Sequence, residues 1–384
     1  MAAIDEVQAI MNEFAGATGL SDKDVPPRRY LWTDAFAVCN FLSLFRRTGD
    51  QGWRQLALAL VEQVHATLGR HRDDDPRSGW ISGLSEQEGR RHPTMGGLRI
   101  GKTLNERMPG DPYDDRLEWD RDGQYYHYLT KWMHALDQVS RFTGDRKFNR
   151  WAVELARAAH AGFVREAPTG DKRMYWKMSI DLSRPLVAAM GQHDPVDGLI
   201  TYRQLQATAE KMSGDHAPAL DGPIEEMAAL CRQISLSTDD PLGLGGLLCD
   251  AYRSARLSAA GRPLQDASAA DLLGAALPGL EAAAGSRRFS LPAEYRLAFR
   301  ELGLSIGLHA VEKMDATVPD IRRTDRLIER LLRHAGLAEK IETFWQDPEN
   351  RLSPTWTKHQ NINSVMLATS LAPDGYLRIT HAEI

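Results

Sequence analysis

Apolar residues recur at helical spacing through most of the chain, whereas the alternation of apolar and polar residues that marks strands is almost absent. Residues 30–48 predict one helix. After a break at Gly49 and Asp50, residues 51–68 predict a second helix, with Leu56, Leu60 and Val64 on one face. Two helices joined by so short a turn predict an antiparallel helical hairpin.

The same unit returns farther along the chain. Residues 125–142 and 148–163 predict a second hairpin, broken at Gly144 and Asp145, and Asp145 follows Asp50 by 95 residues. Turn chemistry, a tryptophan beyond the turn and apolar spacing all match between the two hairpins. The sequence therefore contains an internal repeat.

Further helical patterns complete an all-α prediction. They cover the N-terminal segment and residues 182–190, 199–212, 224–234, 242–257, 269–284, 293–314, 326–345 and 361–371. Repeated hairpins must stack to bury their apolar faces, either as an open solenoid or as a closed ring. The long, irregular connections favour a ring, an (α/α)6 toroid. We expect one domain, 1–384, with long loops at about 70–122 and 165–198.

Inner helices of such a ring should be apolar nearly all round, and outer helices should be amphipathic. Residues 32–45 and 242–248 fit the inner pattern. Residues 51–68, 146–163 and 326–344 fit the outer pattern.

Composition and charge exclude several classes of protein. The chain has 384 residues, of which 42% are hydrophobic and 26% charged, as in ordinary globular proteins. Its net charge of -5 does not favour a broad nucleic-acid surface. The acidic N-terminal stretch resembles no signal peptide, and no run of about 18 apolar residues indicates a membrane span.

The three cysteines, Cys39, Cys231 and Cys249, form neither a disulfide framework nor a zinc motif. We therefore expect a cytoplasmic protein without a metal or other cofactor.

Acidic and aromatic residues concentrate in the segments that precede the presumed inner helices. These segments are 30–34, 117–127, 174–186, 237–246, 290–296 and 352–363. If the chain closes into a ring, all six line the same end. Aromatic rings stack on the apolar faces of sugars, and carboxylates bind sugar hydroxyls, so this composition predicts a small-molecule or oligosaccharide substrate.

Segment 117–127 is the densest of these. Asp120 and Asp122 are candidates for a general acid, because crowded carboxylates raise one another's pKa. Capping of the next helix is the competing interpretation for Asp122. Asp181 and Asp34 are candidates for the second carboxylate, although Asp34 also fits a helix-dipole partner.

The remaining candidates share acidic, aromatic or imidazole character near the same segments. For His359 we expect a catalytic role, and the expected substrate-binding residues are Trp32, Glu118, Trp119, Tyr125, Tyr126, His127, Trp176, Arg184, His193, Trp356 and Asn361. A simple ion pair with Asp181 is the alternative for Arg184, and burial in the core is the alternative for each tryptophan.

Two other motifs are weaker. The aspartates at 73–75 and 114–115 are similar to metal-diphosphate motifs but lie in solvated loops. Gly96 to Thr103 meets the spacing of a phosphate-binding loop, yet neither a strand before it nor a helix after it is predicted, so we interpret the match as chance.

The repeated hairpins, the acid-aromatic loops and the length resemble the six-hairpin (α/α)6-barrel glycosidase-like superfamily, to which N-acylglucosamine 2-epimerase-like enzymes are related. The resemblance implies an active site in the barrel mouth and a glycoside hydrolase that uses two carboxyl groups. An epimerase or isomerase would use two histidines instead, with His193 and His359 as candidates. A non-catalytic binding or scaffold module is the third alternative.

Overall fold

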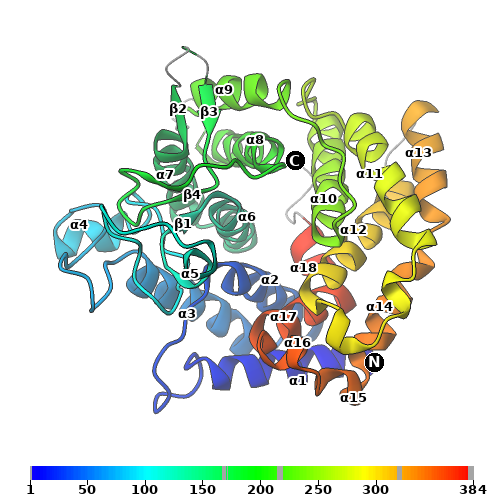
Figure 1. Cartoon of the computed structure of the whole chain (residues 1–384), viewed down its shortest axis with the longest axis horizontal. Helices are drawn as coiled ribbons and strands as arrows, with labels where there is room; N and C mark the ends of the chain where they lie inside the picture. The colour runs from blue at the N-terminus through cyan, green and yellow to red at the C-terminus, as the bar shows by residue number, and fades with distance from the viewer. Residues whose placement is uncertain (1, 167–169, 171, 214–218, 318–321, 379–384) are drawn as a thin grey trace. The chain divides into compact units, whose positions relative to one another are not determined.

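The computed structural model describes residues 2–166, 170, 172–213, 219–317 and 322–378. The chain forms two compact units. Unit 1 comprises Met1–Phe14, Arg46–Gly49 and Gln233–Ile384, and unit 2 comprises Ala15–Phe45 and Asp50–Arg232. Helices predominate in both units (Figure 1).

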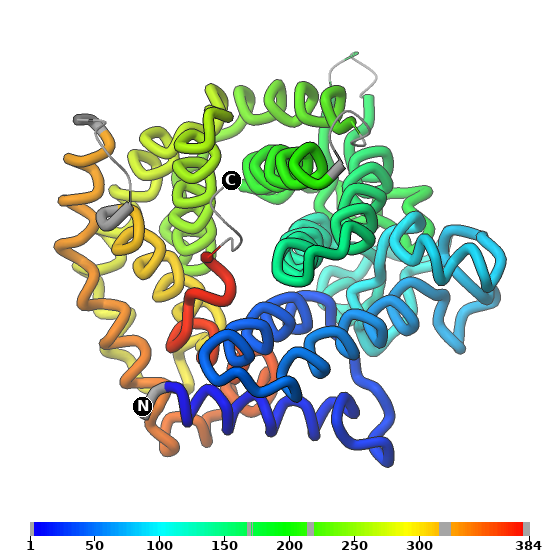
Figure 2. Tube along the Cα trace, turned by 180° about the vertical axis from the view of Figure 1, so that it is seen from behind, coloured from blue at the N-terminus to red at the C-terminus, as the bar shows by residue number. Residues whose placement is uncertain are grey.

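The helices of unit 2 follow the predicted hairpins closely. They are α2 (Leu31–Thr48, whose last residues belong to unit 1), α3 (Gln51–Leu68), α4 (Glu86–Arg91), α5 (Asp115–Asp120), α6 (Tyr126–Thr143), α7 (Arg146–Phe163), α8 (Asp194–Ser213) and α9 (Asp221–Cys231). Helices α6, α7 and α8 pack side by side (Figures 1 and 2).

The predicted repeat is visible in the two turns. Gly49 and Gly144 both have a φ of 73°, a left-handed conformation that glycine adopts without steric cost. Asp50 and Asp145 then cap α3 and α7, each by accepting a hydrogen bond from the amide two residues on. The same three residues, Thr-Gly-Asp, therefore end one helix and begin the next in both hairpins.

The predicted inner and outer helices differ in burial as expected. Every residue of α2 from Leu31 to Leu44 is buried, whereas α3 and α7 bury one face. Trp53 of α3 stacks on Phe41 of α2, with ring centroids 6.0 Å apart. Apolar contact of this kind joins the two helices of the hairpin.

Unit 1 contains the remaining helices. They are α1 (Ala2–Ala17, whose last residues belong to unit 2), α10 (Pro241–Ala259), α11 (Ala269–Gly285), α12 (Ala298–Thr317), α13 (Arg322–Leu332), α14 (Gly336–Gln346), α15 (Pro348–Arg351), α16 (Pro354–Thr357), α17 (Gln360–Leu371) and α18 (Asp374–Leu377), with 3₁₀ turns at Arg288–Ser290 and Ala293–Tyr295. Helix α12 packs against α10, α14 and α17. Gly245 permits the close approach of α10 and α12, because a Cβ there would lie 2.0 Å from the carbonyl oxygen of Gly303.

The sequence prediction was wrong in two places. The predicted helix at 182–190 is instead β5 (Pro185–Val187), because Pro185 lacks an amide hydrogen and Leu182 has a φ of 59°, outside the helical region. The single helix predicted at 326–345 is divided into α13 and α14.

Short strands occur only within unit 2 among the described residues. Strands β1 (Gln124–Tyr125), β4 (Lys177–Met178) and β5 form an antiparallel sheet in the order β1-β4-β5, and β2 (Val164–Glu166) pairs with β3 (Lys172–Met174). Tyr125 pairs with Lys177 in this sheet. The sheet therefore joins the acid-aromatic segment 117–127 to segment 174–187.

Candidate active site

Seven rings of unit 2 form one connected group, which we call the aromatic cluster. Its members are Tyr30, Trp32, Trp119, Tyr125, His127, Tyr128 and Trp176. Tyr125 stacks on Trp176 at 5.1 Å between centroids and on His127 at 5.5 Å. The β1–β4 pairing explains the contact with Trp176, because Tyr125 pairs with Lys177, the residue that follows Trp176.

Burial decreases along the cluster. Tyr125 is 3% exposed and Trp32 6%, whereas Trp119 is 50% exposed. Trp119 meets Trp176 edge to face, with centroids 5.2 Å apart. The cluster thus continues from the interior of unit 2 to its surface, and Trp119 presents a ring to solvent.

Asp194, the first residue of α8, lies against this cluster. Its carboxylate Oδ1 is 3.9 Å from Nδ1 of His127, and its Oδ2 is buried without a hydrogen-bond partner among the described residues. Burial, and secondarily the charge of Asp197, raise the pKa of Asp194 to about 8, against the opposing effect of Lys131. Asp194 therefore carries a proton at neutral pH.

The imidazole beside Asp194 is neutral. Burial is the main cause, with a contribution from Lys131, and lowers the pKa of His127 to about 3, while Asp197 acts in the opposite direction. A protonated acid and a neutral imidazole therefore face the same aromatic surface.

Asp197 lies one helical turn after Asp194, so the two side chains share a face of α8. Its Oδ2 pairs with Nζ of Lys131 at 3.0 Å and also accepts a hydrogen bond from Thr130. Asp197 supplies the negative charge that helps to keep Asp194 protonated. Neither aspartate was among the residues predicted from the sequence, because an aspartate in the first turn of a helix is also typical of a cap, and only the tertiary environment reveals the coupling of the two.

Asp122 is held by arginines rather than by a helix end. Helix α6 begins after Tyr125, so Asp122 does not cap it and that interpretation was wrong. Its carboxylate is fully buried, lies 2.6 Å from Nη1 of Arg99 and 3.5 Å from Nη1 of Arg72, and accepts bonds from the amides of Gly101 and Gly123. These contacts favour a structural role over proton donation.

Asp120 and Trp119 end the short helix α5 on the exposed side of the segment, and the preceding residue anchors them. Glu118 is buried between Lys177 at 3.1 Å and Arg107 at 3.0 Å. Lys177 also donates to the carbonyl oxygens of Glu118 and Arg121. Buried charges therefore fix the position from which Trp119 and Asp120 project.

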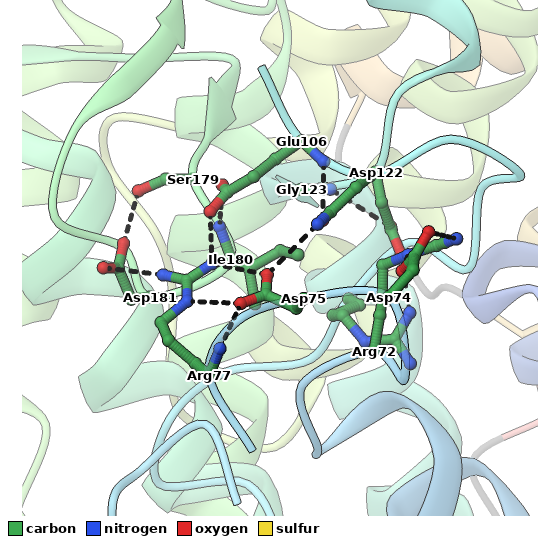
Figure 3. A network of polar contacts seen from close by, with 12 residues as sticks. Arg72, Asp74, Asp75, Arg77, Glu106, Asp122, Gly123, Ser179, Ile180 and Asp181 are labelled. Carbon is green, nitrogen blue, oxygen red and sulfur yellow. Dashed lines mark hydrogen bonds and ion pairs between the residues drawn. The ribbon is translucent and has the colours of Figure 1, made fainter. Parts of the chain in front are cut away.

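Asp181 belongs to the network of polar contacts shown in Figure 3, in which Arg72 and Asp122 also appear. Arg77 lies between the carboxylates of Asp181 at 3.0 Å, Asp75 at 2.9 Å and Glu106 at 2.5 Å. Although burial raises the pKa of Asp181, hydrogen bonds from Ser179 and Ser183 and the charge of Arg77 lower it to about 2. This carboxylate is ionised, and the network fixes the loop after α3 to the segment after β4.

The other predicted residues of unit 2 lie in varied surroundings. Asp34 is buried 3.6 Å from Nη1 of Arg29, and burial raises its pKa to about 6 against the charge of Arg29. Tyr126 is fully buried and donates to the hydroxyl of Tyr202. Arg184 donates to the carbonyl oxygen of Arg107 and makes no ion pair with Asp181, while His193 precedes Asp194 and is half-buried.

Three predicted residues lie in unit 1. Trp356 is buried and stacks on Trp345 with centroids 5.6 Å apart, in agreement with the alternative of burial in the core. His359 is exposed beside Phe299, and Asn361 is exposed in the first turn of α17.

Neither a metal centre nor a phosphate loop appears in the described part of the chain. No group of three histidine, cysteine or acidic side chains there has the arrangement of a metal site. The segment from Gly97 to Thr103 is irregular and flanked by neither strand nor helix, as the sequence context indicated. No described helix has both the length and the apolarity of a membrane span.

The chain is similar in structure, but not in sequence, to several known proteins. No protein-family model matches the chain, and no curated protein matches it by sequence. Among solved structures, a GH76 α-mannanase from Bacteroides thetaiotaomicron is similar over 97% of this chain and 96% of its own, with a TM-score of 0.55 and 8% identity. The GH76A α-1,6-mannanase from Salegentibacter sp. HEL1_6 is similar over 98% and 100%, with a TM-score of 0.53 and 9% identity.

A third similar structure is cellobiose 2-epimerase from Spirochaeta thermophila DSM 6192, over 96% of this chain and 97% of its own, with a TM-score of 0.52 and 15% identity. At these identities the likeness shows the fold alone. It confirms the predicted fold class, the all-α helical-hairpin fold of the (α/α)6 toroid enzymes.

Proposed function

We propose that the protein is a carbohydrate-active enzyme of the glycoside hydrolase type, with Asp194 as its general acid. The observation that carries the proposal is the buried carboxyl group of Asp194, whose Oδ1 lies 3.9 Å from Nδ1 of His127 in the aromatic cluster. Its burial raises its pKa to about 8, which suits a proton donor. The fold class, which the protein shares with mannanases and an epimerase, supports the same conclusion by analogy.

In this proposal a sugar ring stacks on the aromatic cluster, and Asp194 transfers its proton to the glycosidic oxygen as the bond breaks. Hydrolysis also requires an ionised carboxylate to act on water or on the anomeric carbon. Asp197 is our first candidate, because it lies on the same helix face and is paired with Lys131. Two carboxyl groups with opposite protonation states are the pattern that such chemistry requires.

The epimerase alternative is less well supported. A histidine that removes a proton from a sugar should have a pKa near neutrality. Burial lowers the pKa of His127 to about 3, which makes it a weak base. The two histidines first considered belong to different units: His193 is next to Asp194 in unit 2, and His359 is exposed in unit 1. The structure therefore does not place them together as a pair of proton-transfer groups. A purely structural module would gain nothing from a buried carboxyl oxygen that, like Oδ2 of Asp194 in the described part of the chain, has no hydrogen-bond partner, because such an atom costs stability.

The cellular site is part of the proposal. Cys39, Cys231 and Cys249 are buried and form no disulfide within the part of the chain that the structure describes, which suits a reducing cytosol. The proposed partner is an oligosaccharide or a smaller sugar.

The test is a screen of aryl and natural glycosides together with free aldoses, with products followed by NMR. We expect glycoside cleavage by the wild type and a loss of about 10²- to 10⁴-fold in turnover for Asp194→Asn. Asp73→Asn is the matched control, because Asp73 is exposed. Epimerisation of free aldoses without glycoside cleavage would replace this proposal by the alternative. Full activity of Asp194→Asn would contradict the assignment of the acid.

A further inference from the structure

Lys102 differs from the other cations around the aromatic cluster. Arg99 and Arg72 pair with Asp122, and Lys177 pairs with Glu118. Lys102 is half-buried, yet none of the residues that the structure describes places a carboxylate within 4.0 Å of its Nζ. The face of an aromatic ring is a weaker partner for a half-buried ammonium group than a carboxylate, so a ligand that supplies a negative charge would stabilise it further.

The ammonium group lies at the edge of the cluster. Its Nζ is 5.5 Å from the ring centroid of Tyr30, and the Tyr30 hydroxyl is 2.6 Å from that of Tyr128. The ring of Tyr128 in turn contacts His127 at 4.8 Å between centroids. A series of ring contacts therefore joins Lys102 to the imidazole beside Asp194.

The backbone holds Lys102 in this position. The carbonyl oxygen of Lys102 accepts a hydrogen bond of 2.6 Å from Arg72, and the amide of Gly101 donates to Asp122. The carbonyl oxygen of Ile100 accepts from the amide of Leu31 at the start of α2. The segment is thus fixed before any ligand binds, which reduces the entropic cost of recognition.

Two carboxylates lie near Lys102, but neither forms an ion pair with its ammonium group. Burial lowers the pKa of Lys102, and the charges of Asp120 and Asp122 oppose this shift only in part. The charge of Asp122 is already balanced by Arg99 and Arg72. Asp120 is exposed and beyond ion-pair distance of the lysine.

We propose that Lys102 recognises a carboxylate group of the substrate, so that the preferred ligand is an acidic sugar such as a uronic acid unit of an oligosaccharide. Lys102 is separated from His127, the neighbour of Asp194, by the rings of Tyr30 and Tyr128. The acidic unit would therefore be next to the sugar whose glycosidic bond is cleaved, not that sugar itself. A phosphate group is disfavoured, since the amides of Arg99, Ile100 and Gly101 are all engaged within the protein and form no phosphate cradle.

This inference rests on the proposed function and specifies its substrate class. The test measures binding by calorimetry at low salt. The probes are D-glucuronate and D-galacturonate, as free sugars and as 1,4-linked dimers. Their methyl esters are the uncharged controls, because they have nearly the same size but no carboxylate charge. Glucose 6-phosphate and mannose 6-phosphate provide the phosphate comparison.

We expect at least one acid to bind about tenfold more tightly than its ester, and rising salt to reduce the difference. Lys102→Met should abolish the preference, whereas Lys102→Arg should retain most of it. Lys23→Met is the matched control, because it removes an exposed charge from the same unit.

Equal binding of acid and ester, persistence of the preference in Lys102→Met, or a preference for the phosphates would each overturn the inference. In these cases the sugar still binds and the proposed function stands. Failure of every acidic and neutral sugar, including the glycosides of the turnover screen, to bind would overturn both proposals.

Discussion

Gly191 lies directly against the carboxyl group of Asp194: a Cβ on Gly191 would lie 2.2 Å from Oδ2 of Asp194, so a larger residue at position 191 would displace that carboxyl group. The amide of Asp194 also donates to the carbonyl oxygen of Gly191, which closes the turn at the start of α8. The absence of a side chain at Gly191 therefore determines where the acid lies.

We expect Gly191→Ala to fold normally but to lose activity. The atoms that would clash belong to the end of a flexible side chain, which can rotate away at low cost. Displacement of a catalytic group by about 1 Å can reduce turnover by about 10²-fold. The measurement is turnover together with thermal unfolding. In the Asp194→Asn background, Gly191→Ala should reduce turnover little further. If the two losses of turnover were fully additive, Gly191→Ala would not act through the position of Asp194.

The protonated state of Asp194 predicts a pH dependence of stability. Its folded-state pKa is about 8, above the ordinary value of 3.8, so the folded protein binds more protons between these pH values. Stability from this group is therefore present at low pH and decreases as the pH rises from about 4 to about 8. Asp194→Asn should unfold at a higher temperature than wild type at pH 8, with a much smaller difference at pH 4.5.

The pH dependence of turnover should also depend on the protonation of Asp194. Because the proposed acid must be protonated, activity should decline as the pH rises above about 8. A rate that remains constant between pH 6 and pH 10 would exclude Asp194 as the proton donor.

Asp122 and Asp120 should respond differently to amide substitution. Asp122→Asn leaves Arg99 buried without its charge partner, so we expect a loss of about 3–5 kcal/mol in the free energy of unfolding. Asp120→Asn alters an exposed side chain and should change stability little. Urea denaturation of both variants measures the difference. A catalytic role for Asp122 would require lost turnover in a variant that keeps wild-type stability.

Trp119 offers a test of the outer part of the aromatic cluster. Because the ring is 50% exposed and rests on Trp176, Trp119→Ala should fold well. Loss of one stacking surface should raise KM for an oligosaccharide about threefold to tenfold, with little change in kcat. Trp119→Phe should recover part of the affinity. An unchanged KM for every oligosaccharide turned over would remove Trp119 from the binding surface.

Local chemistry explains which features the sequence could predict. In the turns at 48–50 and 143–145, a glycine ends one helix and an aspartate caps the next by bonding an amide two residues away. These effects are local in sequence, so the hairpins and the repeat were predictable. The aromatic segments were identified for the same reason. That they meet depends on the β1–β4 pairing, which joins residues about 50 positions apart and has no periodic signal.

The proposed acid, Asp194, could not be predicted from the sequence. Asp194 at a helix start looks like a cap, and its altered pKa arises from burial and from Asp197, which only the packed structure reveals. Asp122 was chosen for its crowded acidic neighbourhood. Its partner Arg99 is 23 residues away, and no spacing rule predicts that ion pair.

The short sheet has a consequence for the order in which the chain folds. The hairpin of α6 and α7 forms from contacts between neighbouring segments, which are quick to establish, whereas the pairing of Tyr125 with Lys177 must close a much longer loop. The aromatic cluster should therefore be completed after the helices that support it. A partly unfolded molecule would keep helical circular dichroism while the fluorescence of Trp119 and Trp176 had already changed. The proposed sugar-binding surface would then form last during folding and be lost first during unfolding.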